Sequence, residues 1–92
     1  MKNLSIEVVR NMGHRVSVTQ FRYLESGGMA MRRAIPKGER ISPRGGQVHV
    51  KITTFDNKEV EGVANCSPLD NFRAKYGLMK ALGRAYAELV KL

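Results

Sequence analysis

The sequence predicts an α+β fold in which an antiparallel sheet of four to five strands is packed by one C-terminal helix. Three observations predict it. Apolar and polar residues alternate through much of residues 1–66, which is the strand period. Turn-forming residues divide these runs into two hairpins and a middle strand. Residues 67–91 carry apolar side chains at helical spacing. The 92 residues fit one domain, 1–92, with a basic loop at 36–46.

The first hairpin and the middle strand are predicted from short alternating runs. Residues 4–8 and 15–19 each alternate apolar and polar side chains, and the turn-forming segment 11–14 lies between them. Two glycines at 27–28 then break the chain. Residues 29–35 are predicted to form the middle strand.

A basic loop is predicted next. The segment 35–46 contains two prolines and three glycines, which argue against regular structure. Long loops are uncommon in small domains and are often functional. We therefore expect the loop 36–46 to contribute to a binding surface.

The last hairpin is predicted from the strand 47–55 and the returning strand 59–66. A two-residue turn would pair Ile52 with Glu61 and mix apolar with acidic side chains. A three-residue connection, 56–58, keeps the apolar partners on one face, and burial of one face sets the register. We therefore predict that Ile52 pairs with Gly62, Val50 with Ala64, and Val48 with Cys66.

The C-terminal helix is predicted to begin at Ser67, which is a natural N-cap. Pro68 suits the first helical position, and Asp70 lies three residues after the cap. The predicted apolar face consists of Phe72, Tyr76, Met79, Gly83, Tyr86 and Val90, extended by Leu78, Leu82 and Leu89. A small-residue edge of Gly77, Ala81 and Ala85 would allow close packing. For Gly77 itself, contact with a partner is the alternative to packing.

The net charge of +8 is clustered along the chain. Residues 29–51 hold six Lys and Arg against one Glu, and residues 67–92 hold five against two acids. Residues 52–66 are acidic, with one lysine against three carboxylates. Clustered charge creates a field that attracts an anionic partner. The predicted binding residues are Arg32, Arg33, Lys37, Arg40, Arg44, Arg73, Lys80, Arg84 and Lys91.

Four of these cations form a row on the predicted helix. Arg73, Lys80, Arg84 and Lys91 project within about 40° of one another, in a row about 27 Å long. The alternative to a binding row is an ordinary solvated helix face.

The segment from Cys66 to Ala85 resembles the C-terminal part of small, mostly uncharacterised bacteriophage-encoded proteins. In those proteins, a strand ending in Cys-x-Pro-x-Asp-Asn-Phe continues into a helix with a Gly-x-x-x-Ala-x-Gly-Arg-Ala pattern. The matching residues are 66–72, 76–77 and 80–85, and the likeness covers about 20 of the 92 residues. Leu78 departs from the pattern, which has Arg or Lys there. The resemblance implies a viral or prophage-borne chain and implies no catalytic residues.

Other residue types give little support for enzyme chemistry, so we predict no catalytic residues, no metal and no cofactor. His14 and His49 have no partner at metal-ligand spacing. Cys66 cannot form an internal disulfide, and we predict a buried thiol, with a reactive thiol as the alternative. A metal-dependent nuclease would have to use the three carboxylates of the last hairpin, which are Asp56, Glu59 and Glu61.

The location of the protein is predicted to be cytoplasmic. The sequence has no run of 18 apolar residues, so no membrane span is predicted. The first residues lack the hydrophobic core of a secretory signal.

The charge pattern predicts a small basic phage-type accessory protein that binds DNA or RNA mainly through backbone phosphates. Aromatic residues for base stacking are few, and Phe21, Tyr23 and Phe55 form no RNP-like pattern. The sequence therefore favours duplex or backbone-directed binding over sequence reading. The alternative function is a phage-type inhibitor or modulator that binds an acidic surface of a host nuclease, polymerase or defence component. A third possibility is a homodimer formed through Met29, Met31 and Ile35.

Overall fold

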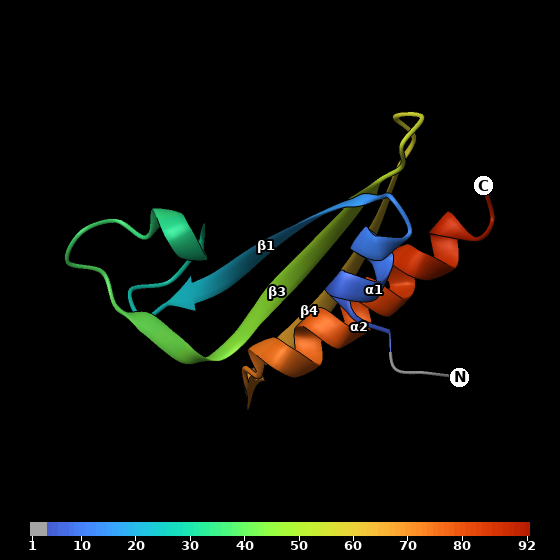
Figure 1. Ribbon diagram of the computed structural model, residues 1–92. Coiled ribbons are helices and arrows are strands. Elements are labelled where there is room, and N and C mark those ends of the chain that lie inside the picture. The colour runs from blue at the N-terminus through green and yellow to red at the C-terminus, as the bar shows by residue number, and fades with distance from the viewer. Residues whose placement is uncertain (1–3) are drawn as a thin grey trace.

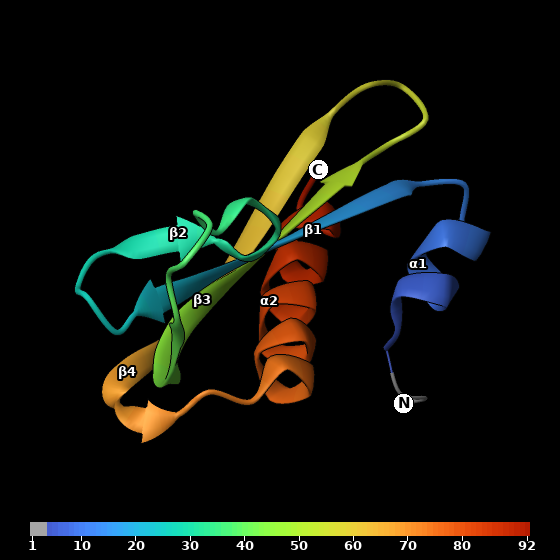
Figure 2. The same ribbon diagram turned by 90° about the vertical axis from the view of Figure 1, so that its left-hand side faces the viewer.

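The computed structural model describes residues 4–92 and has an α+β fold, as predicted. The four strands form one antiparallel sheet in the order β2-β1-β3-β4 (Figures 1 and 2). Both helices lie on the same side of this sheet (Figures 1 and 2). The elements are α1 (Ile6–Asn11), β1 (Arg15–Leu24), β2 (Met29–Met31), the 3-10 turn η1 (Arg32–Ala34), β3 (Ile41–Thr53), β4 (Glu59–Asn71) and α2 (Ala74–Leu89). Neither helix has the length and apolar character needed to cross a bilayer.

The prediction of a strand at residues 4–8 is wrong, because this segment begins helix α1. Ser5 is the N-cap, and its hydroxyl accepts a hydrogen bond from the Val8 amide at 3.2 Å. Val9 is fully buried, and Arg10 stands in the last turn, where a cation is favoured. A five-residue alternation is too short to distinguish a strand from one face of a short helix.

The middle of the chain contains more strand and less loop than predicted. The predicted strand 29–35 is limited to β2, which is three residues long, and η1 follows it. β3 begins at Ile41, so the second half of the predicted loop 36–46 is strand. Gly45 allows this, because it has φ 77° at the register shift in β3 and lies against the ring of Tyr23. Only residues 35–40 remain irregular between η1 and β3.

The predicted register of the last hairpin is wrong by two residues. Ile52 pairs with Val60, Val50 with Gly62, and Val48 with Ala64. The connection is longer than predicted because Thr54 organises it: the Thr54 amide donates to the Lys58 carbonyl, and the Lys58 amide donates to the Thr54 hydroxyl. A shift of two residues preserves the face on which each side chain lies, so the predicted apolar face is still the core face.

Asp56 in this connection makes stability depend on pH. The buried Thr54 hydroxyl donates to the Asp56 carboxylate, and this bond is the main cause that lowers the pKa of Asp56, with Lys58 adding to it. A lowered pKa in the folded state stabilises the fold above the ordinary pKa, and this contribution is lost as the pH falls through the folded-state value.

We therefore expect Asp56→Asn to reduce the free energy of unfolding at neutral pH, and the difference from the wild type to shrink below about pH 4. Urea unfolding followed at several pH values measures this difference. In a Thr54→Val background, the same substitution should have little pH-dependent effect. An equal loss at acid and neutral pH would contradict the role of the carboxylate.

The predicted start of the C-terminal helix at Ser67 is also wrong. β4 continues to Asn71, and α2 begins after Arg73, which is its N-cap. The Ser67 hydroxyl instead accepts a hydrogen bond from the Leu69 amide within a bulge of β4. This bulge exists because Cys66 pairs with Gly46 and Asn71 pairs with Arg44, so residues 67–70 lie opposite one residue of β3.

The core lies between α2 and the β3–β4 half of the sheet. Ala81, Leu82 and Ala85 of α2 are buried, together with valines and isoleucine of β3. Four residues of the predicted apolar face are instead exposed, namely Tyr76, Met79, Gly83 and Val90. The predicted small-residue edge is confirmed, because Ala81 and Ala85 pack their backbone directly on Gly62, and Gly77 lies on Val48.

Candidate functional site

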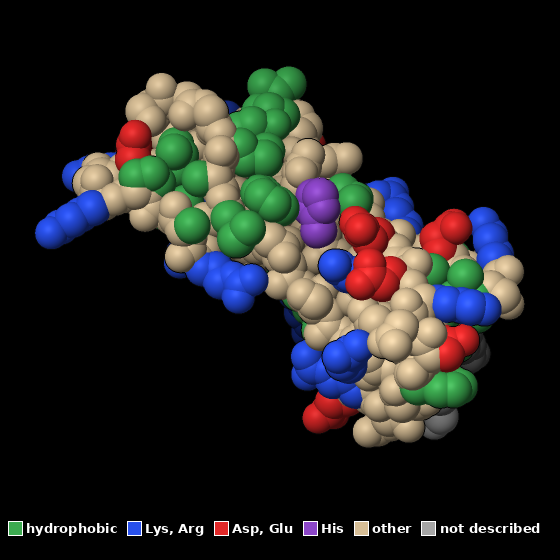
Figure 3. All heavy atoms as spheres, turned by 90° about the horizontal axis from the view of Figure 1, so that it is seen from above, with side chains coloured by type: hydrophobic (Ala, Val, Ile, Leu, Met, Phe, Trp, Pro, Cys, Tyr) green, Lys and Arg blue, Asp and Glu red, His purple; other side chains and the backbone are tan. Residues whose placement is uncertain are grey.

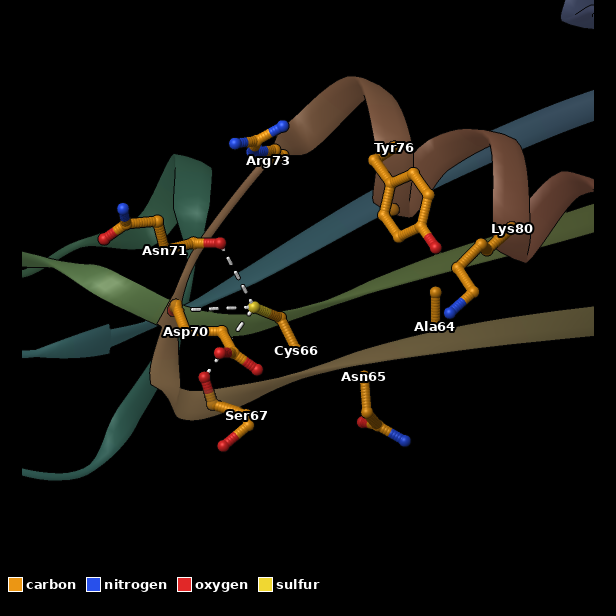
Figure 4. Close-up of a pocket in the computed structure, with 10 residues that line it drawn as sticks. Ala64, Asn65, Cys66, Ser67, Asp70, Asn71, Arg73, Tyr76 and Lys80 are labelled. Carbon is orange, nitrogen blue, oxygen red and sulfur yellow. Dashed lines mark hydrogen bonds between the residues drawn. The ribbon is translucent and has the colours of Figure 1, made fainter.

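A protruding bulge at residues 67–70 separates the strand part of β4 from α2. The Cys66 sulfur lies beneath it, 3.7, 3.6 and 3.5 Å from the carbonyl oxygens of Ser67, Asp70 and Asn71 (Figure 4). These distances fit a weak S–H donor that fills the bulge. The sequence predicted a buried thiol, whereas the structure leaves Cys66 half-buried. Leu69, at the tip of the bulge, is 82% exposed.

A pocket of about 370 Å³ lies between this bulge and the first turns of α2. Arg73 and Lys80, two of the predicted cations, line it together with Asn65 and Tyr76. Tyr76 and Lys80 extend from α2 toward β4 (Figure 4). The Lys80 ammonium lies 5.0 Å from the centre of the Tyr76 ring, which is within cation–π range. Asp70 lines the pocket as well, so the lining combines two cations with one carboxylate and has a net charge of +1.

Arg22 on β1 lies close to this region, although it is absent from the sequence-predicted set. Its guanidinium lies 4.0 Å above the ring of Phe72 and donates to the Ser42 carbonyl at 3.1 Å. Its buried Nε has no hydrogen-bond partner among the residues described. Burial, followed by the charge of Arg32, lowers the pKa of Arg22. In the sequence, Arg22 is distinguished only because it is an arginine on the same face of the strand as Val16 and Val18.

Two basic segments that are distant in the sequence meet around Phe72. Its amide donates to the carbonyl of Pro43, the residue before Arg44, and Arg73 follows it directly. We call the four arginines of this region the arginine junction, which consists of Arg22, Arg32, Arg44 and Arg73. Within residues 4–92, none of them forms a salt bridge; the ion pairs there are Lys51–Glu59, Lys58–Asp56 and Lys91–Glu88. Among the described residues, therefore, no arginine of the junction has a carboxylate as an ion-pair partner.

The other predicted cations lie elsewhere. Arg33 is exposed on η1, and Lys37 and Arg40 are exposed on the irregular segment that projects at the left of Figure 1. Arg84 donates to the Val63 carbonyl at 2.6 Å, which ties α2 to the outer strand β4. Lys91 lies beyond the C-terminal end of α2 and pairs with Glu88 at 3.2 Å. The predicted row is therefore divided: Arg73 belongs to the arginine junction, Arg84 is bound to β4, and Lys91 is paired with Glu88.

Two of the three acidic side chains of the last hairpin lie near a lysine. Asp56 lies 3.8 Å from Lys58, and Glu59 lies 3.9 Å from Lys51. Across residues 4–92, no three His, Cys, Asp or Glu side chains gather in a way that could hold a metal ion.

Comparison with known proteins identifies no similar protein. No family model matches the chain, and no curated protein and no solved structure gives a significant match. The fold and the site define a small basic α+β domain with an arginine junction around Phe72.

Proposed function

We propose that this chain is a small phage-type accessory protein that binds nucleic acid, mainly through backbone phosphates, at the arginine junction. The observation that carries the proposal is the charge of this junction, which no carboxylate of residues 4–92 pairs with. Arginine presents a planar fork of donors that matches phosphate oxygens. The resemblance of residues 66–85 to bacteriophage-encoded proteins supports the phage-type assignment.

The arginines have different tasks in this proposal. Arg44 and Arg73 are exposed, so their guanidinium groups are accessible to phosphates. Arg22 is held by Phe72 and Ser42, so it adds a fixed positive charge behind them. Lys80 extends this charge into the pocket beside Tyr76. Binding of this kind requires no cofactor and no catalytic group, and it takes place in the cytoplasm of the host cell.

The proposal predicts binding that weakens steeply with salt. Counterions are released when cations contact phosphates, and log K falls by about 0.9 per phosphate contact for each unit of log salt. With about four contacts, affinity should fall roughly 100-fold when salt rises fourfold. Gel-shift titrations with single-stranded and duplex probes measure this dependence. An absence of any shift at low salt would overturn the proposal.

An acidic host protein is the second candidate partner, and the exposed Leu69 favours it. A leucine that is 82% exposed beside an arginine cluster offers the apolar anchor that protein interfaces use and phosphate contacts do not need. A pull-down from nuclease-treated bacterial lysate distinguishes the two partners. A captured protein that survives nuclease and is lost with Leu69→Ser would support the second candidate, as an inhibitor or modulator.

A further inference from the structure

The side of the sheet opposite α1 and α2 carries a second organised surface. Phe21 pairs with Met31 and Tyr23 pairs with Met29, so these four side chains lie on one face of β1 and β2. His49 of β3 lies on this face as well, beside Phe21. Figure 3 looks onto this side and shows hydrophobic side chains next to a histidine, with acidic side chains beyond it. We call this surface the ring face; it consists of Phe21, Tyr23, Met29, Met31 and His49.

The rings of this face are held in defined positions. The centres of Phe21 and His49 are 4.9 Å apart with an interplanar angle of 63°, which is an edge-to-face contact. The His49 Nε2 lies 3.0 Å from the Gln47 side-chain oxygen, which fixes the imidazole. Both rings are half-buried, in contrast to Phe55, which is 84% exposed on the hairpin connection. Rings that are already ordered lose little conformational freedom when a flat group stacks on them.

A small hollow lies beside these rings. It measures about 200 Å³ and is lined by Ser17, Thr19, Phe21, Met31, His49 and Lys51, among others. The hollow therefore combines apolar rings with hydroxyl groups, one ammonium group and the carboxylate of Glu61. Such a lining suits a planar heterocycle that has polar edges.

The charge of the chain segment that supplies Met29, Met31 and His49 favours a polyanion as the occupant of the ring face. Residues 29–51, which include β2, η1 and β3 up to Lys51, hold six cations and one carboxylate. A second copy related by two-fold symmetry would bring the same cations against these. A polyanion with flat apolar groups complements both the rings and the cations. Glu61 of the outer strand lines the hollow, and its carboxylate repels phosphates, so the phosphates of such a ligand would lie toward β1 and β2 while a base occupies the hollow.

We propose that unpaired nucleotides of DNA or RNA bind the ring face, with at least one base stacked on Phe21 and His49. The inference rests on the proposed function, since the phosphates of the same strand use the cations of residues 29–51. Bases in a duplex are covered by their neighbours, so only single strands or melted segments can make this contact. The ring face thus makes the protein prefer single strands.

The test uses fluorescence anisotropy with the full chain. The probes are a labelled oligothymidylate of about 12 nucleotides, its ribonucleotide counterpart and a duplex of equal length. Phe21→Leu keeps an apolar side chain and removes the ring, and Phe55→Leu is the matched control on the hairpin connection. We expect Phe21→Leu to weaken single-strand binding at least about fivefold. Duplex binding should be weaker than single-strand binding and should not change, and Phe55→Leu should behave as the wild type.

The outcomes separate this inference from the proposed function. Binding that is equal for Phe21→Leu and Phe55→Leu, or a preference of the wild type for duplex, overturns the inference and leaves phosphate binding intact. A wild-type chain that binds no nucleic acid overturns both. Aromatic NMR signals of wild-type Phe21 and His49 give a measurement that does not depend on variant folding. These signals should shift upfield with the oligonucleotide and not with inorganic phosphate, and unchanged signals overturn the inference.

Discussion

Replacement of both Arg44 and Arg73 by glutamine is expected to weaken nucleic-acid binding roughly 100-fold at low salt, because a hydrogen bond to a charged group contributes about 1.5 kcal/mol. The slope of log affinity against log salt should also decrease by about two, since each arginine–phosphate contact contributes about one. Both side chains are exposed, and neither makes a side-chain hydrogen bond within residues 4–92 that the fold would lose. The gel-shift titration over a range of salt measures both quantities.

The matched control is the double variant Arg15→Gln, Lys58→Gln. It also removes two of the positive charges from the net +8, but near the connection at the opposite end of β3 from Arg44. We expect this control to lose little affinity. If both double variants weaken binding equally, the affinity depends on the net charge of the chain, and the arginine junction has no special role in binding.

Gly62→Ala is expected to remove about 3 kcal/mol or more from the free energy of unfolding. A β-carbon at this position would overlap the carbonyl oxygen of Ala81 and the amide nitrogen of Ala85, which are backbone atoms of α2. These atoms can move only if the whole helix shifts from the sheet. Because small domains have about 5–15 kcal/mol of stability, this loss should be visible in urea or thermal unfolding.

Gly83→Ala is the matched control in the same helix. A β-carbon at Gly83 meets no atom within 4 Å, and alanine is preferred to glycine in a helix by about 0.8–1.0 kcal/mol. We expect this variant to be more stable than the wild type. If Gly62→Ala unfolded at the same temperature as the wild type, α2 would not pack on β4 as described.

The elements with long regular patterns were the ones that could be predicted. The alternation around Val48, Val50 and Ile52 identified a strand and its core face, and the spacing of Leu82 and Leu89 identified the helix. Local signals were less reliable. Ser67, Pro68 and Asp70 have the pattern of a helix start, yet they form a bulge, because pairing of Asn71 with Arg44 extends the strand past them. Tertiary pairing outweighed the local preference.

The candidate site was predictable in its parts and unpredictable in its assembly. Arg32, Arg44 and Arg73 were recognised as binding candidates from charge clustering. Their proximity depends on the register shift at Gly45 and on the bond from the Phe72 amide to Pro43, which sequence patterns do not report. Arg22 was not predicted as a binding residue, because an arginine on the core-facing side of a strand is rare unless a carboxylate pairs with it. Here the face of the Phe72 ring contacts the guanidinium instead.

The contact between Arg84 and Val63 has a consequence for how copies of the chain behave when crowded. β4 is an outer strand, and its unpaired backbone groups can template a neighbouring strand. A polyanion that holds several copies side by side would bring such edges together. The Arg84 guanidinium occupies the Val63 carbonyl in the middle of this edge. A charge placed there therefore hinders the pairing of two such edges into a continuous sheet.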